Sequence, residues 1–222
     1  MTKNMVVLAS SGGSVLDEAL KVDACRQHIA LVVCDRECGA EWVARRHGVA
    51  VEVMPCCTGR EFSDALYDYF LGKPEIDLFL SSYSRLLSGK FLQKYRGRIV
   101  NFHPAVLPAC PGLDGFGDTL KAGCKFIGAT VHFVDEGMDT GRPILQAARP
   151  HDPGLSDEEN RQRVFMQMCR MFVQIVTWFA AGRVDQQGSV LGARYRLSEF
   201  SPNLDSVHAI EFAQAFCPED KE

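Results

Sequence analysis

The chain has 222 residues, 46% of them hydrophobic, which is enough to bury the core of one large globular domain. Its 24 Lys and Arg and 28 Asp and Glu residues give a formal net charge of −4, so a general basic surface for nucleic acid is excluded and we expect no nucleic-acid partner. The first apolar run, residues 5–9, is too short for a signal peptide, and no run approaches the ~18 apolar residues of a membrane span. We therefore expect a cytoplasmic protein with no membrane association, acting on a small molecule.

The nine cysteines are scattered along the chain and form none of the paired C-x-x-C clusters that structural zinc sites use. Most lie in or beside apolar runs, where a free cysteine in a reducing cytosol behaves as a small core residue. We therefore expect no bound metal. Cys110 is the exception, because it lies in the loop that follows the candidate site.

Short apolar runs alternate with helix-like segments over the first 103 residues. The predicted strands are residues 5–9, 29–34, 49–53, 76–80 and a run that ends near residue 101. Apolar residues at helical spacing lie between these runs, and the capping box TGRE at residues 58–61 opens one of the predicted helices. Strands that alternate with helices predict an α/β fold with a doubly wound, Rossmann-like parallel sheet.

The pattern changes after residue 125 to consecutive strands, at residues 128–134 and again from residue 144, which predicts an antiparallel C-terminal extension of the sheet. A second capping box, SDEE at residues 156–159, opens the longest predicted helix, and Gly182 is its expected end. Short strands are expected between residues 183 and 195.

No internal repeat or low-complexity linker divides the chain. We expect a single domain over residues 1–200, made of a first half, residues 1–103, and a second half, residues 104–200. Residues 201–222 become polar and acidic and are expected to form a tail.

Two polar side chains end the strand that precedes Pro104. Asn101 and His103 are two residues apart and so point to the same face of the sheet, and Pro104 cannot donate to a sheet ladder, so pairing should stop there. Open α/β sheets bind ligands at the carboxyl ends of their strands. The acidic loop of residues 135–141 connects two predicted strands and can hold a carboxylate against this strand end. His132, in the strand before that loop, is expected to be an ordinary packed histidine.

An Asn, a His and an Asp in one cleft suit a reaction that builds negative charge on an oxygen. The amide and a protonated imidazole can donate hydrogen bonds to an oxyanion, and the carboxylate can orient the imidazole or accept a proton from an attacking amine. No serine or cysteine is placed as a nucleophile, which favours direct transfer between two bound substrates. These residues alone leave open the alternative that Asn101 and His103 only cap the end of a strand.

The segment SSGGS at residues 10–14 joins the first strand to a helix. Amide groups at such a turn can cradle an anion. The segment is not G-x-G-x-x-G and has no Walker lysine, so a plain tight turn explains it equally well.

Several stretches together resemble the 10-formyltetrahydrofolate-dependent formyltransferase family. They are NFHP at residues 101–104, LP at 107–108, PGL at 111–113, GATVHFVDEGMDTGRPILQ at 128–146 and WFAAGR at 178–183. The resemblance runs from about residue 6 to residue 183. It implies the formyltransferase fold, with a nucleotide- or phosphate-side first half and a folate-side second half.

The resemblance also implies an activity, namely transfer of a formyl group from 10-formyltetrahydrofolate, as co-substrate, to an amine. The branch of the family with the most similar length and motif order formylates glycinamide ribonucleotide in purine biosynthesis, which makes this the default acceptor. As partners we expect the folate and the small-molecule amine, and the protein itself is expected to be a monomer or a homodimer.

The family's functional residues can be carried over onto this chain. Asn101, His103 and Asp139 match its catalytic residues. The matching folate-binding positions are Arg85, Leu86, Leu87, Ile99, Asp135, Glu136, Gly137 and Met138. The matching acceptor-binding positions are Gly12, Gly13, Ser14 and Arg60. The Leu107–Pro108 bond matches a cis-proline of the family.

The departures from the family lie on the acceptor side. Val15, Phe165 and Met168 are apolar where the family has polar groups, and Asp114 stands where the family usually has a histidine. Two alternatives therefore remain. One is a formyltransferase of the same family that acts on another amine, such as an amino sugar nucleotide or a small metabolite. The other is a non-catalytic protein that binds a folate or a nucleotide.

Overall fold

The computed structural model describes residues 2–191, 195–196 and 201–202, so the tail expected over residues 201–222 lies almost wholly outside the described residues. The strands are β1 (Met5–Ala9), β2 (Ile29–Cys34), β3 (Ala50–Val53), β4 (Leu78–Ser82), β5 (Ile99–His103), β6 (Phe126–Phe133), β7 (Pro143–Pro150), β8 (Tyr195–Arg196) and β9 (Ser201–Pro202). The helices are α1 (Ser14–Leu20), α2 (Asp23–Arg26), α3 (Gly39–Arg46), α4 (Gly59–Phe70), α5 (Gly89–Lys94), α6 (Gly115–Lys121) and α7 (Asp157–Ala180).

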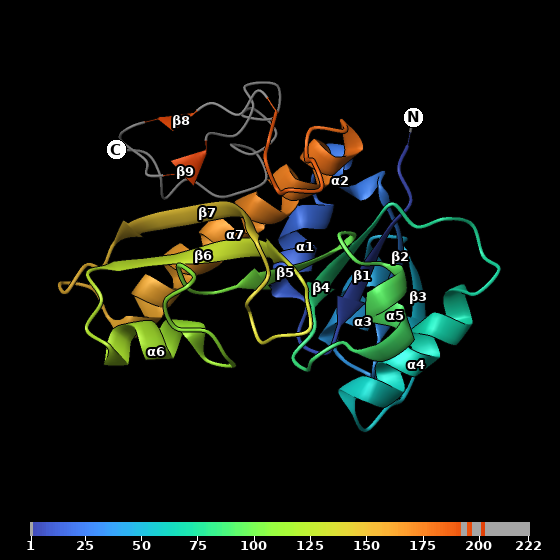
Figure 1. The fold of residues 1–222 in the computed structure, drawn as a ribbon. Helices are drawn as coiled ribbons and strands as arrows, with labels where there is room; N and C mark the ends of the chain where they lie inside the picture. The colour runs from blue at the N-terminus through green and yellow to red at the C-terminus, as the bar shows by residue number, and fades with distance from the viewer. Residues whose placement is uncertain (1, 192–194, 197–200, 203–222) are drawn as a thin grey trace.

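One seven-stranded sheet runs through the molecule in the order β3-β2-β1-β4-β5-β6-β7 (Figure 1). The strands from β1 to β5 pair in parallel, and β6 and β7 pair antiparallel to their neighbours. This confirms the predicted doubly wound, Rossmann-like sheet with an antiparallel C-terminal extension. The strand order reverses at β1, which β2 and β4 flank. Loops leave such a switch point in opposite directions, and the crevice between them is where open α/β sheets bind ligands.

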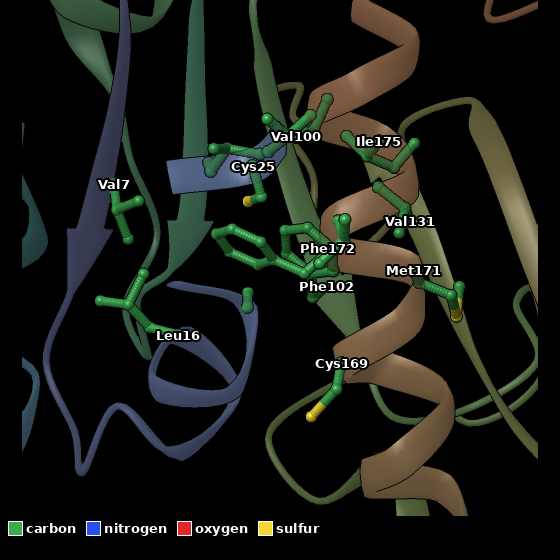
Figure 2. Close-up of a cluster of buried hydrophobic side chains, with 14 of the residues drawn as sticks. Val7, Leu16, Cys25, Val100, Phe102, Val131, Cys169, Met171, Phe172 and Ile175 are labelled. Atoms are coloured by element: carbon green, nitrogen blue, oxygen red, sulfur yellow. The ribbon is translucent and has the colours of Figure 1, made fainter. Parts of the chain in front are cut away.

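Helices cover both faces of the sheet. Residues of α1, α3 and α7 share one buried hydrophobic cluster with the sheet, and residues of α4 and α5 form a second cluster on the sheet. In the first cluster Phe172 of α7 stacks on Phe102 of β5, with 5.0 Å between ring centroids and 18° between ring planes (Figure 2). This contact fixes α7 against the strand that carries Asn101 and His103.

The fourth strand lies two residues further along the chain than residues 76–80, where it was predicted. Its last two residues, Ser81 and Ser82, pair with Leu8 and Ala9 of β1, so hydrogen bonding to a neighbour carries the strand past the end of the apolar run. Asp77 lies just before the strand, and its carboxylate accepts hydrogen bonds from Lys3 Nζ and from the Asn4 amide. The strand end is thereby brought level with Asn101, which pairs with Ser81.

Two short helices, α2 and α6, were not predicted. In α6 the first turn contains glycines at positions 115 and 117, and glycine disfavours a helix in the absence of other contacts. The carboxylate of Asp114 offsets this by accepting a hydrogen bond from the Gly117 amide, at 3.1 Å. Of the short strands expected between residues 183 and 195, the described residues show a bridge between Val184 and Val190 and the first residue of β8, Tyr195, which pairs with β9.

The predicted capping box of α7 is present. The Ser156 hydroxyl accepts from the Glu159 amide at 3.2 Å, and the Glu159 carboxylate accepts from the Ser156 amide at 2.8 Å. The helix ends at Ala180, two residues before Gly182, whose φ of 66° is the left-handed conformation expected of a C-terminal glycine. No helix among the described residues combines the length and the apolar character needed to cross a membrane.

We expect Ser156→Ala to lower the free energy of unfolding by about 1 kcal/mol, because it removes the side-chain acceptor at the start of α7. Ser156→Asp keeps an acceptor and should stay within about 0.5 kcal/mol of the wild type. Urea denaturation of the three proteins would measure this. An equal loss in both variants would contradict the capping role.

Candidate active site

A cavity of about 460 Å³ lies at the switch point of the sheet, over the carboxyl ends of β1, β4 and β5. Its walls come from the segment between β1 and α1, the loop after β4, the end of β5 and the loop between β6 and β7. The predicted site residues among its lining are Gly12, Gly13, Ser14, Arg85, Leu86, Leu87, Asn101, His103, Gly137, Met138 and Asp139. Segments that are far apart in the sequence therefore meet at one place.

Four of the predicted site residues do not line the cavity. Ile99 is fully buried in the cluster under α4 and α5. Arg60 projects from the first turn of α4 with 86% of its side chain exposed, and its Nε lies 3.9 Å from Asp64. Asp135 folds its own loop by accepting from the Gly137 amide and the Thr140 hydroxyl, and Glu136 is exposed, 3.7 Å from Arg96.

His103 is buried between a carboxylate and a backbone carbonyl. Its Nδ1 lies 3.4 Å from Asp139 Oδ2, and its Nε2 donates to the carbonyl oxygen of Cys110 at 2.7 Å. Gly115 lies against the ring, since a Cβ there would be 2.5 Å from Nε2. With Nε2 committed to Cys110, Nδ1 is the ring atom that faces the carboxylate, at a distance longer than an ordinary hydrogen bond.

Asp139 is the residue at which the contacts of the site meet. Its φ of 55° is uncommon for a residue other than glycine, and its side chain is only 12% exposed. Besides His103, its Oδ2 accepts from the Gly112 amide at 2.8 Å, and its Oδ1 lies 3.4 Å from Nε2 of His132. A single carboxylate therefore contacts two histidines and the loop that follows β5.

His132 contacts both Asp139 and Asn101 and is therefore part of the site. The sequence had predicted only an ordinary packed histidine. Its Nδ1 lies 2.8 Å from the Phe133 carbonyl oxygen, which can only accept, so Nδ1 carries the proton. In the neutral ring Nε2 then accepts from the Asn101 amide, at 3.4 Å. Burial lowers the pKa of His132 below its ordinary value of 6.5, although Phe133 and Asp139 oppose this, so the ring is neutral at pH 7. The contact arises because His132 is the β6 partner of Asn101.

A buried hydroxyl holds the loop between β5 and α6. Thr130 Oγ1 accepts from the Leu107 amide at 3.0 Å and from Gln146 Nε2 at 3.1 Å, and it donates to the Ala105 carbonyl at 2.8 Å. The Leu107–Pro108 bond in this loop is cis, as the resemblance implied. The Cys110 carbonyl that accepts the hydrogen bond from His103 belongs to the same loop, at a residue with a φ of 53°.

Arg85 is held in place by a residue that the sequence reasoning missed. Its guanidinium lies 2.8 Å from Oδ2 of Asp35, which is completely buried, and 3.1 Å from the Cys56 carbonyl. Arg36 binds the same carboxylate through two further hydrogen bonds. Because two cations satisfy Asp35, Arg85 is fixed at the wall of the cavity. Among the described residues no group of three His, Cys, Asp or Glu side chains could hold a metal ion.

We expect Thr130→Val to lower the free energy of unfolding by about 2–4 kcal/mol, because it leaves a buried amide and a buried carbonyl without partners. Thr119→Val is the matched control, since Thr119 is also buried but its hydroxyl bonds only the Gly115 carbonyl within its own helix. Thr119→Val should lower the free energy of unfolding by less than about 1 kcal/mol. Chemical denaturation measures both, and equal losses would contradict the proposed anchoring of the loop.

The lowered pKa of His132 predicts a pH dependence of stability. Below about pH 6.5 the unfolded chain binds a proton that the folded chain does not, so His132 makes the protein lose stability as the pH falls. The slope between pH 6.5 and 5 should therefore be shallower in His132→Gln, by up to about 1.4 kcal/mol per pH unit. Denaturation at several pH values measures this, and an unchanged slope would contradict it.

The sequence is similar to those of known proteins. The family model described as formyl transferase matches residues 3–176. A protein of Mycobacterium tuberculosis named phosphoribosylglycinamide formyltransferase is 35% identical over 189 residues, which cover 83% of this chain and 88% of that protein. A Bacillus subtilis protein of the same name is 37% identical over 171 residues, which cover 73% of this chain and 87% of that protein.

The fold is also similar to solved structures. The crystal structure of glycinamide ribonucleotide transformylase 1 from Symbiobacterium toebii superposes with a TM-score of 0.75 at 35% identity. The match covers 85% of this chain and 93% of that one. The similarity therefore extends over both the parallel and the antiparallel parts of the sheet.

Proposed function

The chain belongs to the formyl transferase family, and on this premise we propose that it transfers a formyl group from 10-formyltetrahydrofolate to the amine of glycinamide ribonucleotide. The observation that carries the proposal is that Asn101, His103 and Asp139 line one cavity, with the carboxylate paired to the imidazole. A non-catalytic binding protein would not need this arrangement. The named relatives support the acceptor.

The three residues divide the chemistry between them. The Asn101 amide, fixed by neutral His132, donates to the formyl oxygen as negative charge develops there. His103, when it carries both ring protons, adds a positive charge beside that oxygen. Asp139 orients His103 and takes up, directly or through one water, the proton that the attacking amine loses. The folate would supply the formyl group: the acceptor nitrogen would bond to the formyl carbon, the bond from that carbon to the folate nitrogen would break, and this nitrogen would take up the displaced proton as tetrahydrofolate leaves.

The proposed folate side is the wall formed by Arg85, Leu86, Leu87, Gly137 and Met138. Leu86 and Met138 are both about half exposed at this wall and offer apolar surface to a flat ring system. Arg85 adds a fixed cation for an anionic part of the folate. Asp135 supports this side by shaping the loop that carries Gly137.

The proposed acceptor side is the wall formed by Gly12, Gly13 and Ser14 together with α7. Gly13 allows the close approach of α3 here, because its φ is 75° and a Cβ would lie 2.6 Å from the Ala40 Cα. Val15 and Met168 also line the cavity, whereas Phe165 packs on the core without lining it. The apolar character of Val15 and Met168 favours a second candidate function, formyl transfer to a different amine.

A transfer assay tests the proposal. With 10-formyltetrahydrofolate and glycinamide ribonucleotide the wild type should release tetrahydrofolate, and Asp139→Asn should lower kcat/KM by about 10²-fold or more, because the carboxylate can no longer accept the proton. Asp118→Asn, which neutralises an exposed carboxylate of α6 outside the cavity, should leave kcat/KM within about twofold.

Equal activity of Asp139→Asn and the wild type would contradict the role of Asp139. A wild type that binds the folate tightly but gives no product would reject glycinamide ribonucleotide as the acceptor.

A further inference from the structure

The acceptor side of the cavity is lined by apolar side chains. The residues that β1, α1, α3, β5 and α7 contribute are Val7, Ala9, Val15, Leu16, Ala40, Phe102 and Met168. Val15 and Met168 are partly buried and pack against the main hydrophobic cluster, so the core continues into this wall. The polar side chains on this side are the hydroxyls of Ser11 and Ser14.

The charged and titratable groups of the cavity come from residues 83–139 of the chain. Among the described lining residues they are Tyr83, Arg85, His103, His132 and Asp139, which come from the loop after β4, from the end of β5, from β6 and from the loop after β6. Residues 7–40 and α7 contribute no lysine, arginine or carboxylate to the lining. Arg60, the cation expected here, is outside the cavity and 86% exposed.

An apolar wall changes what a substrate can gain from binding. A sugar hydroxyl placed against Val15 or Met168 would give up hydrogen bonds to water and receive none from these side chains. A methylene group at the same place would gain contact area at no such cost. Val15 and Met168 therefore favour apolar substituents of the substrate, and a hydroxyl group gains no hydrogen bond from them.

We propose that this enzyme recognises the body of its acceptor by apolar contact, so that it accepts primary amines whose substituent lacks hydroxyl groups at least as well as it accepts a ribonucleotide. The inference rests on the proposed function, because the wall of Arg85 to Leu87 and Gly137 to Met138 is assigned to the folate and leaves the opposite wall for the acceptor. Val15 and Met168 are then its specificity-determining residues.

The expected discrimination differs sharply between the two kinds of site. A site that hydrogen-bonds a substrate hydroxyl rejects the analogue without it by about 10⁴-fold or more, because buried polar groups are left unpaired. An apolar wall has no such groups, so removal of hydroxyls should change affinity and kcat/KM by less than about tenfold and can improve both.

The test uses two acceptors that differ only in these groups: glycinamide ribonucleotide and its 2′,3′-dideoxy analogue. Their dissociation constants are measured by calorimetry on the full chain saturated with tetrahydrofolate, and kcat/KM is measured with 10-formyltetrahydrofolate. We expect the dideoxy analogue to bind within tenfold of the ribonucleotide or more tightly. A loss of 100-fold or more on removal of the hydroxyls, or failure of both acceptors to bind, would overturn the inference.

Matched variants assign the effect to the wall. Met168→Gln adds a donor and an acceptor of similar length and should shift the binding ratio toward the ribonucleotide by about tenfold, the worth of one hydrogen bond. Met166→Gln is the control, since Met166 lies on the same helix, partly buried, but does not line the cavity. Equal ratios in Met168→Gln and Met166→Gln would overturn the role of Met168.

The binding and turnover measurements separate the two proposals. Binding of both acceptors with a ratio near one, but without formyl transfer, would support the apolar recognition and contradict the proposed reaction. Transfer to the ribonucleotide with a 100-fold loss for the dideoxy analogue would support the reaction and overturn the apolar recognition.

Discussion

The site depends on one buried carboxylate. A carboxylate that is removed from water needs donors or cations, and Oδ2 of Asp139 has the Gly112 amide at 2.8 Å and His103 Nδ1 at 3.4 Å, whereas Oδ1 lies beside Nε2 of neutral His132. Its contacts reach β5 through His103, β6 through His132 and the loop after β5 through Gly112. The left-handed backbone of Asp139 is tolerated because these contacts hold the residue in place. The positions of the two histidines and of the loop are therefore coupled through a single side chain.

The sheet supplies the frame in which that carboxylate can act. Asn101 pairs with Ser81 of the parallel part and with His132 of the antiparallel part, so the change of strand direction occurs at the strand that carries the site. The parallel part opens a crevice at its switch point, and the antiparallel part brings a second histidine beside the first. The stack of Phe172 on Phe102 then ties α7, and with it Met168, to the same strand.

Features set by neighbours in sequence could be predicted, and features set by distant pairing could not. Two polar residues at strand spacing before a proline were enough to place Asn101 and His103 at a strand end, and the two capping boxes were equally local. The role of His132 depends on the register between β5 and β6, which no local pattern specifies. Ile99 lies on the same face of β5 as Asn101 and His103. It does not reach the cavity, because it is buried in the hydrophobic cluster that includes α4 and α5. Asp35 was missed because its partner Arg85 is fifty residues away.

The hydroxyl of Thr130 makes the loop between β5 and α6 a rigid segment. It holds the Leu107 amide and the Ala105 carbonyl from inside β6, where Thr130 itself is completely buried. The loop amide at Leu107 can then exchange its hydrogen with solvent only when the sheet itself opens, as a strand amide does. Although irregular in backbone conformation, this stretch belongs to the rigid scaffold and not to a lid. The imidazole of His103, which donates to the Cys110 carbonyl of this loop, is therefore held in position before any substrate arrives.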